Sequence, residues 1–417
     1  MSLARSLSSL AGRSPWPLLM ASALLLAAPR AAAQDPAWIR QLGTTSWDSA
    51  TATASDGAGG LYVGGFTFRN LAGPSLGPRS DAWLARYDTA GNQLWISQFG
   101  TSTDDFAWAA VADGSGGVYV SGTTHGTLGG AQFGISDIWV ARYDGAGNQL
   151  WIRQFGSKIQ DWVRSIVADG SGGVYVGGIT QGDLASPNAG GFLPGADVWL
   201  ARFDGAGNRL WARQFGTYSD DTLGGLAPDG SGEVFVSGTD GTSTWLARYD
   251  GSGQLIWTRY FGTIDFETVY DAAPDGSGGV YLVGTTNGTF GGPNAGFFDA
   301  WVARFDSAGG GLWVRQFGTV GSDIAWAAAS DGLGGVYVTG TNTVPLPAGK
   351  WQRNVWLARF DGSGNQQSIS RLGTSADDDP KAAAPDGLGG VYVSGETFGS
   401  LGGPNAGQLD AWFAHWQ

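Results

Sequence analysis

Residues 137–156 read DIWVARYDGAGNQLWIRQFG, and the same pattern returns along the whole chain after residue 38. Its closing phrase, Trp-x-Arg-Gln-Phe-Gly-Thr, ends near glycines that stand 46 to 60 residues apart, and the copy at 368–374 is degraded. These glycines are Gly43, Gly100, Gly156, Gly216, Gly262, Gly318 and Gly373. A repeat of this length, rich in Gly, Trp and Val, indicates an array of similar β units.

Each unit contains four predicted strands joined by short turns. In the second unit they cover residues 105–112, 117–124, 137–144 and 149–156. Asp-Gly and Gly-Asn pairs separate these segments, and such pairs favour tight hairpins because they accept positive φ. Seven units of four antiparallel strands predict an all-β fold, a single seven-bladed β-propeller.

The two ends of the chain are complementary. The last unit stops after its third strand, and residues 38–43 supply a fourth-strand sequence, so the N-terminal strand is expected to complete the last blade and close the ring. The propeller is expected to cover 35–417. Its blade units are expected at about 44–100, 101–156, 157–216, 217–262, 263–318, 319–373 and 374–417 plus 38–43.

Two residue columns are predicted to build the core. The third strand of every unit carries a tryptophan: Trp83, Trp139, Trp199, Trp245, Trp301, Trp356 and Trp412. Three positions later most units carry an arginine, expected to pair with a repeat aspartate or to lie over an aromatic ring. In the last unit His415 occupies this arginine position.

The first 34 residues differ from the repeats. They combine Arg5 and Arg13, an apolar run at 18–28 and small residues at 31–33, which is typical of a cleaved secretory signal peptide. Without this segment the chain has 20 basic and 36 acidic residues, because three of its 23 basic residues and none of its acids lie there. We expect an exported protein, periplasmic, cell-surface or extracellular, without a transmembrane segment and without nucleic acid as a partner.

The phrases LWIRQFG, DGSGGVYVSGTT and DIWVARYDGAGNQ closely resemble the bacterial β-propeller repeat family called SBBP. The resemblance covers about 38–417. It implies a propeller fold and a location outside the cytoplasm, and it implies no catalytic motif.

Five residues after each repeat glycine stands a carboxylate: Asp48, Asp105, Asp161, Asp221, Glu267, Asp323 and Asp378. This acid column is expected at one mouth of the central channel, since the first strand of a propeller blade is innermost. It predicts either an acidic ring that attracts a cation or seven caps that accept backbone N–H bonds in their turns.

Three residues beyond the acid column the residue type changes from unit to unit. The seven residues are Thr51, Trp108, Arg164, Gly224, Tyr270, Trp326 and Lys381. This variable column is either a tolerant position or a channel lining.

The connections between second and third strands are expected on the same face as the acid column, here called the loop face. Some of them carry unusual basic or aromatic residues, and together with Lys381 these predict a small binding patch. Its members are Arg69, Arg79, Lys350, Trp351, Arg353 and Lys381.

Two functional classes follow. The favoured one is a secreted, non-enzymatic binding or scaffold propeller, monomeric, whose partner is a protein, a glycan or a cell-surface component. The alternative is a propeller enzyme, hydrolase-like or quinoprotein-like, with Ca²⁺ held by carboxylates at the channel. No catalytic residue and no cofactor is predicted firmly, and Ca²⁺ is the one metal that the acid column suggests.

Overall fold

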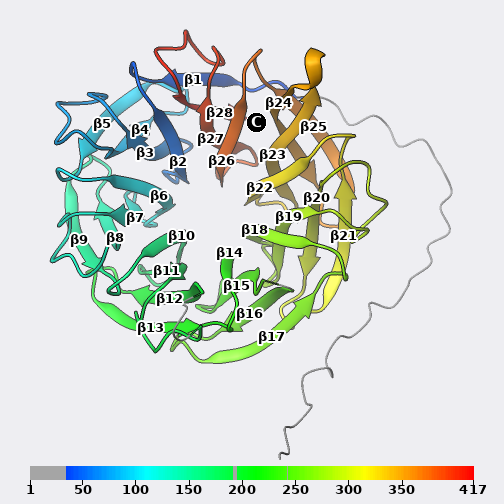
Figure 1. The fold of residues 1–417 in the computed structure, drawn as a ribbon, viewed down its shortest axis with the longest axis horizontal. Helices are drawn as coiled ribbons and strands as arrows, with labels where there is room; N and C mark the ends of the chain where they lie inside the picture. Colours follow the sequence, from blue (N-terminus) through cyan, green and yellow to red (C-terminus); the bar gives the residue numbers. More distant parts are fainter. Residues whose placement is uncertain (1–33, 191–194, 242) are drawn as a thin grey trace, which may run out of the picture.

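The computed structural model describes residues 34–190, 195–241 and 243–417. Within these residues the strands form seven four-stranded antiparallel sheets, which stand as blades around a central axis (Figure 1). The predicted seven-bladed propeller is thereby confirmed, whereas the predicted signal peptide lies almost wholly outside the described residues.

The first four blades follow the chain in order, and each begins with its innermost strand. Blade 1 contains β2 (Asp48–Ser55), β3 (Leu61–Thr67), β4 (Asp81–Tyr87) and β5 (Gln93–Phe99). Blade 2 contains β6 (Asp105–Ala112), β7 (Val118–Thr124), β8 (Asp137–Tyr143) and β9 (Gln149–Phe155). Blade 3 contains β10 (Asp161–Ala168), β11 (Val174–Thr180), β12 (Asp197–Phe203) and β13 (Arg209–Phe215). Blade 4 contains β14 (Thr222–Pro228), β15 (Val234–Thr239), β16 (Thr244–Tyr249) and β17 (Leu255–Phe261).

The last three blades include one irregular member, blade 6. Blade 5 contains β18 (Glu267–Pro274), β19 (Val280–Thr286), β20 (Asp299–Phe305) and β21 (Gly311–Phe317). Blade 6 contains β22 (Asp323–Ser330), β23 (Val336–Pro345), β24 (Trp351–Phe360) and β25 (Gln366–Leu372), with a 3-10 turn at Pro347–Gly349. Blade 7 contains β26 (Asp378–Pro385), β27 (Val391–Thr397) and β28 (Asp410–Trp416), completed by β1 (Trp38–Leu42).

The ring closes through the two ends of the chain. β1 pairs with β28 in an antiparallel register that sets Trp38 opposite His415 and Leu42 opposite Ala411. The predicted closure is therefore confirmed, and blade 7 is held by pairing between segments more than 350 residues apart in sequence. Figure 1 shows β1 beside β28 at the outer edge of the ring.

The turns follow from the Asp-Gly phrases. In blade 2 the Asp113 carboxylate accepts bonds from the N–H groups of Ser115 (2.7 Å) and Gly117 (2.8 Å), which holds the β6–β7 turn. The Asp144 carboxylate does the same for Ala146 and Asn148 at the β8–β9 turn. Both are Asx turns, in which a side chain mimics a backbone acceptor.

Adjacent blades are joined by the tryptophan and arginine columns. The third-strand tryptophans are at most 5% exposed, so the structure confirms them as core. Arg142 illustrates the arginine column: its Nη2 lies 2.8 Å from the Asp113 carboxylate, its guanidinium lies 5.3 Å from the centre of the Tyr119 ring, and its Nη1 donates to the Gly205 carbonyl of the next blade. His415 takes the same role in blade 7, with Nε2 2.9 Å from Asp386.

No described segment forms a helix of the length and apolar character that crossing a bilayer demands.

Candidate functional site

The seven innermost strands surround a central cavity of about 980 Å³. These strands are β2, β6, β10, β14, β18, β22 and β26 (Figure 1). The variable column of the sequence lies in the wall of this channel, and all seven of its residues line it. The column is therefore a channel lining.

A β-bulge places each residue of the variable column. In blade 2 the register of β6 against β7 jumps between Ala107 and Ala109, so Trp108 has no partner in the pairing. The same jump brackets Arg164 in blade 3 and Tyr270 in blade 5. Because a bulge adds one unpaired residue and bends the strand, it redirects that side chain.

A glycine opposite each bulge makes the geometry feasible. Gly122 of β7 pairs with Ala107, beside the bulge. A Cβ on Gly122 would lie 1.8 Å from the Phe106 carbonyl oxygen and 2.6 Å from the Trp139 ring. The equivalent glycines of the other blades meet a carbonyl of the inner strand at 1.8–2.1 Å in the same way. The glycine of the repeated GTT phrase is thus a requirement of the bulge.

Two parts of the channel wall are aromatic. Trp108 stacks with Phe106 at a centroid distance of 5.2 Å and contacts Phe66 of blade 1 at 5.8 Å. Tyr270 lies 4.6 Å from Trp326 of the next blade. Each of the two tryptophans donates its indole N–H to a threonine hydroxyl of its own blade at 3.1 Å, and this bond fixes the ring.

The channel differs between its two ends. The inner strands end toward the Asp-Gly turns in small residues and prolines, such as Ala112, Ala168, Pro228 and Pro274. That end therefore offers a small, mostly apolar wall. The aromatic and cationic side chains lie nearer the loop face, because the bulge residues stand three residues after the acid column, in the first half of the inner strands.

Arg164 is a cation in the channel wall without a counter-charge. Among the described residues its guanidinium has no hydrogen bond and no ion pair, although the side chain is exposed to the channel. The surrounding wall withdraws it from bulk water, and this desolvation lowers the pKa of Arg164, while Tyr270 acts in the opposite direction. An arginine in such surroundings is suited to a carboxylate or another planar anion.

Among the bulges of the described inner strands, only the one at Tyr270 is directly followed by a carboxylate, Asp271. It accepts bonds from the N–H of Ala272 (2.8 Å) and, across the blade boundary, from the N–H of Ala328 (2.9 Å). Burial raises the pKa of Asp271 to about 7, although these two hydrogen bonds act to lower it. Its charge therefore changes near neutral pH.

A charge network joins the channel to the loop face at blades 6 and 7. Lys381 Nζ lies 2.8 Å from Glu396, and Glu396 is the register partner of Asp379. Asp379 in turn lies 2.8 Å from Arg353 Nε on the long β24 strand. Lys381 and Arg353 are hence both neutralised, unlike Arg164.

The acid column lies at the start of the inner strands, and its side chains are buried. Asp161, for example, is 0% exposed and accepts a bond of 2.6 Å from the N–H of Ser157, four residues earlier. Asp323 accepts bonds from the N–H and the hydroxyl of Thr319. These contacts match the interpretation of the column as turn caps.

Most members of the column face a second carboxylate. A Cβ on Gly100 would lie 2.9 Å from both an Asp105 oxygen and an Asp81 oxygen, so the two carboxylates converge on this glycine. In the described residues one oxygen of each, Oδ1, is buried without a hydrogen-bond partner. Burial raises the pKa of Asp105, with Asp81 adding to the effect, against hydrogen bonds from Thr124 and Thr101.

The predicted cation site stays a prediction. Within residues 34–190, 195–241 and 243–417 no three His, Asp or Glu side chains converge in a way that could hold a metal ion.

The predicted basic patch is divided among four places. Lys381 lies in the channel, and Arg353 lies against Asp377 and Asp379. Lys350 and Trp351 lie at the end of the β23–β24 hairpin, where Trp351 contacts the Phe297 ring of blade 5 at 6.0 Å. Arg69 and Arg79 lie in the β3–β4 connection, and Arg79 is 3.8 Å from Asp104.

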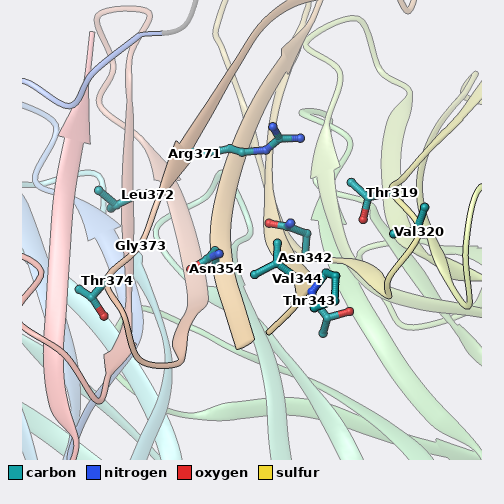
Figure 2. Close-up of a pocket in the computed structure, with 11 residues that line it drawn as sticks. Thr319, Val320, Asn342, Thr343, Val344, Asn354, Arg371, Leu372, Gly373 and Thr374 are labelled. Carbon is teal, nitrogen blue, oxygen red and sulfur yellow. The ribbon is translucent and has the colours of Figure 1, made fainter. Parts of the chain in front are cut away.

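Sequence reasoning missed three features of the site. Asp271 and Glu396 interrupt columns of small or neutral residues, so comparison of the units could have found them. A second hollow at blade 6, lined by Asn342, Asn354 and Arg371 (Figure 2), was missed as well. Its signal was the seventh phrase, SISRLG, which carries an arginine at the position where the other units carry glutamine or tyrosine.

The repeat resemblance is confirmed by a family match. The sequence model of a family described as "Beta-propeller repeat" (SBBP) matches residues 150–185. This range runs from β9 of blade 2 through β11 of blade 3. One segment of this seven-bladed propeller, residues 150–185, therefore matches the SBBP repeat.

Other similarities are more distant. The Regulatory protein FlaEY of Caulobacter vibrioides is 28% identical over 187 residues, which are 41% of this chain and only 19% of that protein's length. Among solved structures, YCF48 bound to a D1 peptide is 12% identical with a TM-score of 0.48, covering 92% of this chain and 98% of that chain. A Dyadobacter fermentans protein of unknown function is 12% identical with a TM-score of 0.43 and the same coverages.

Proposed function

We propose that this propeller is an exported, monomeric, non-enzymatic binding module that holds a segment of a protein partner in the loop-face half of its channel. Propellers commonly bind proteins, and their specificity lies in side chains mounted on a rigid ring. The observation that carries the proposal is the variable column. Seven bulges direct residues of six different types into a single cavity.

The residue types in this cavity fit a protein partner. Trp, Tyr and Arg are the residues that dominate binding energy in protein interfaces, especially where they are enclosed. The channel presents Trp108, Trp162, Trp326, Tyr270 and Arg164 in one wall. The Trp108 and Trp326 rings are fixed by hydrogen bonds and by contacts with Phe106 and Tyr270, so little entropy of these two side chains is lost on binding.

The charged side chains of the channel wall predict the charge of the bound segment. Lys381 is paired with Glu396, whereas Arg164 has no partner among the described residues. A bound acidic side chain would supply the missing counter-charge of Arg164. The partner segment is therefore an extended peptide that carries aromatic or apolar residues and an acidic residue.

Selection from a displayed peptide library tests this function. The mature chain is immobilised, and the enriched peptides are measured against the wild type and against Arg164→Gln and Trp326→Ala. We expect acidic peptides to be enriched and both variants to weaken them at least tenfold, whereas Trp351→Ala, on the distant hairpin, leaves binding unchanged. Equal affinity for the wild type and Arg164→Gln would refute the channel as the site.

Export rests on the composition of residues 1–34. Fractionation of cells that produce the full chain tests it: a shortened product outside the cytoplasm is expected, and a full-length cytoplasmic product would contradict export.

A further inference from the structure

The connection between second and third strands folds back over its own blade in most of the propeller. In blade 5 this connection places Phe290 against Trp301 at a centroid distance of 5.2 Å, and Gly291 donates its N–H to Gln316 Oε1 (3.1 Å). Gln316 Nε2 donates to Asp299 (3.0 Å) and to the Gly288 carbonyl (2.9 Å). One glutamine thus holds the connection through an acceptor and a donor at once. We call the place where the connection rests the blade seat.

Four other blades repeat this contact. Backbone N–H groups of the connection donate at 2.8–3.0 Å to a fourth-strand glutamine in each, and the pairs are Leu71 with Gln98, Gly129 with Gln154, Leu184 with Gln214 and Leu401 with Gln41. The segment in the seat carries an apolar residue, Leu71, Leu128, Leu184 or Leu401, that packs against the core. The seat is therefore shaped for an extended chain with one apolar side chain.

Blade 6 does not cover its own seat. Its β23 and β24 continue for ten residues each, up to Pro345 and Trp351, so the chain leaves the blade as a straight hairpin. A hollow of about 400 Å³ lies at the seat, between Thr319 and Val320 on one side and residues 371–374 on the other (Figure 2).

The polar residues of the seat also differ in blade 6. Arg371 stands at the position of the glutamine, because it pairs with Trp356 as Gln316 pairs with Trp301. Asn342 and Asn354 replace the threonine and the aspartate that stand opposite each other in blade 1, Thr67 and Asp81. The blade 6 seat therefore carries a cation where blade 5 carries a neutral amide.

Two polar groups in this hollow lack hydrogen-bond partners among the described residues, although the Arg371 charge does act on the Asp323 carboxylate and lowers its pKa against the raising effect of burial. The Arg371 side chain is exposed and, among the described residues, makes no hydrogen bond and no ion pair. Asn342 is only 4% exposed, yet its Oδ1 atom is buried without a hydrogen-bond partner in that part of the chain. Figure 2 shows Arg371 extending across the hollow toward the side of Thr319, with the Asn342 amide in the same space. A buried acceptor without a donor is costly unless a ligand or water satisfies it.

We propose that the blade 6 seat binds an extended peptide segment of a partner, with an apolar side chain in the place of Phe290 or Leu401 and a carboxylate on Arg371. Glutamine offers both an acceptor and donors, whereas arginine has only donors, so the seat selects an acceptor. A carboxylate suits it best, because arginine binds carboxylates with two parallel bonds. A backbone N–H of the segment supplies the donor that Asn342 Oδ1 lacks, and Val320, Val344 and Leu372 supply apolar contact.

The carboxylate has two sources with the same chemistry, a chain terminus or an acidic side chain. Three fluorescein-labelled pentapeptides of glycine and serine distinguish them: one ends in leucine with a free carboxylate, one is the same peptide amidated, and one is amidated with an internal leucine–glutamate pair. Fluorescence anisotropy with the mature chain gives each affinity. We expect binding of the first or the third peptide, and at least tenfold weaker binding of the second.

Matched variants test whether the peptide binds at the blade 6 seat. Arg371→Gln restores the residue of the other blades and is expected to weaken binding at least tenfold, with an unchanged melting temperature as evidence of folding. Gln316→Arg introduces the same cation in blade 5, where the connection covers the seat, and is expected to add no second site. Arg164→Gln changes the channel only, so its effect separates this seat from the proposed channel function.

The proposal fails if no peptide binds the wild type at millimolar concentration. It also fails if the amidated leucine peptide binds as tightly as the carboxylates, or if Arg371→Gln binds with wild-type affinity.

Discussion

The tryptophan positions between the blades, here called the frame, and the bulge positions in the channel wall are built from the same seven repeats. The frame keeps one residue type in every blade, whereas the wall changes its residue type from blade to blade. The third-strand position of the frame holds tryptophan in all seven blades, each at most 5% exposed. The bulge position of the wall holds six residue types in seven blades. Tryptophan in the frame is contacted from its own sheet and from the neighbouring blade, for example Trp139 by Phe99 of blade 1 at 5.7 Å. A bulge residue faces the cavity on one side, so that its size and charge are free to differ.

This difference separates stability from recognition. Positions enclosed on every side keep one residue because close-packed interiors tolerate few changes of volume. Positions that border a cavity can change without disturbing the ring. The following substitutions test that division, in order of decreasing effect on stability.

The largest effect is expected for Trp139→Ala in the frame. Removing a fully buried indole leaves a cavity between blades 1 and 2, and such truncations cost about 3–5 kcal/mol of the free energy of unfolding. Chemical denaturation of the mature chain measures the loss. Trp351→Ala is the matched control, because Trp351 is 46% exposed. A similar loss in both variants would contradict the distinction between frame and surface.

A smaller loss is expected for Gly122→Ala. The added methyl group meets the Phe106 carbonyl at 1.8 Å, and overpacking of this kind costs about 1–3 kcal/mol. Gly73→Ala is the control, since a Cβ on Gly73 would meet no atom within 4 Å. Because the bulge depends on this close approach, the variant should also displace Trp108 in the channel wall. Unchanged stability in Gly122→Ala would show that the bulge does not require glycine.

The pH dependence of stability is expected to be intermediate in size. Burial raises the pKa of Asp221 to about 6 and that of Asp271 to about 7, so the folded chain holds protons that the unfolded chain has released. Their stabilising contribution is complete below pH about 3.8 and is lost as pH rises through 6 and 7. Asp113 acts in the opposite sense: burial tends to raise its pKa, but bonds from Ser115 and Arg142 lower it overall, and its contribution is lost as pH falls below 3.8.

Maximum stability is therefore expected near pH 4–5. Thermal unfolding between pH 3 and pH 9 measures the curve. Asp221→Asn should flatten the decline between pH 4 and pH 6, whereas Asp306→Asn, in an exposed turn, should leave that decline unchanged. A melting temperature that rises steadily from pH 4 to pH 7 would disprove the expected decline.

The smallest effect on stability is expected for Arg164→Gln in the channel wall. Arg164 has no partner among the described residues, so its loss should change the free energy of unfolding by no more than about 0.5 kcal/mol. The same denaturation experiment measures it. A loss comparable to that of Trp139→Ala would place Arg164 in the frame and remove the argument for a recognition surface.

The order of the residues was enough to predict the seven blades, the strand boundaries within a few residues and the closure of blade 7 by β1. The repeat also predicted the core role of the tryptophans, the contacts of the arginine column with an aspartate or an aromatic ring, and the place of His415 in that column. These features are local or repeated: hairpin turns need Asp and Gly, and blades need apolar faces on both sides. Seven copies of one pattern made each of these inferences independent of any single residue.

Tertiary structure alone decided where side chains point. The acid column was expected at one mouth of the channel, but only the packing of neighbouring segments showed that Asp105 is buried and faces Asp81. A bulge leaves no distinct mark in an alternating sequence, because one unpaired residue shifts the register only relative to a partner strand. The seat of blade 6 is open because the connection between β23 and β24 does not fold over Arg371. This depends on how two segments are placed relative to each other, which the sequence of neither segment specifies by itself. The direction and the burial of each side chain arise from strand pairing and from packing between blades, and they determine which surfaces are open to a partner.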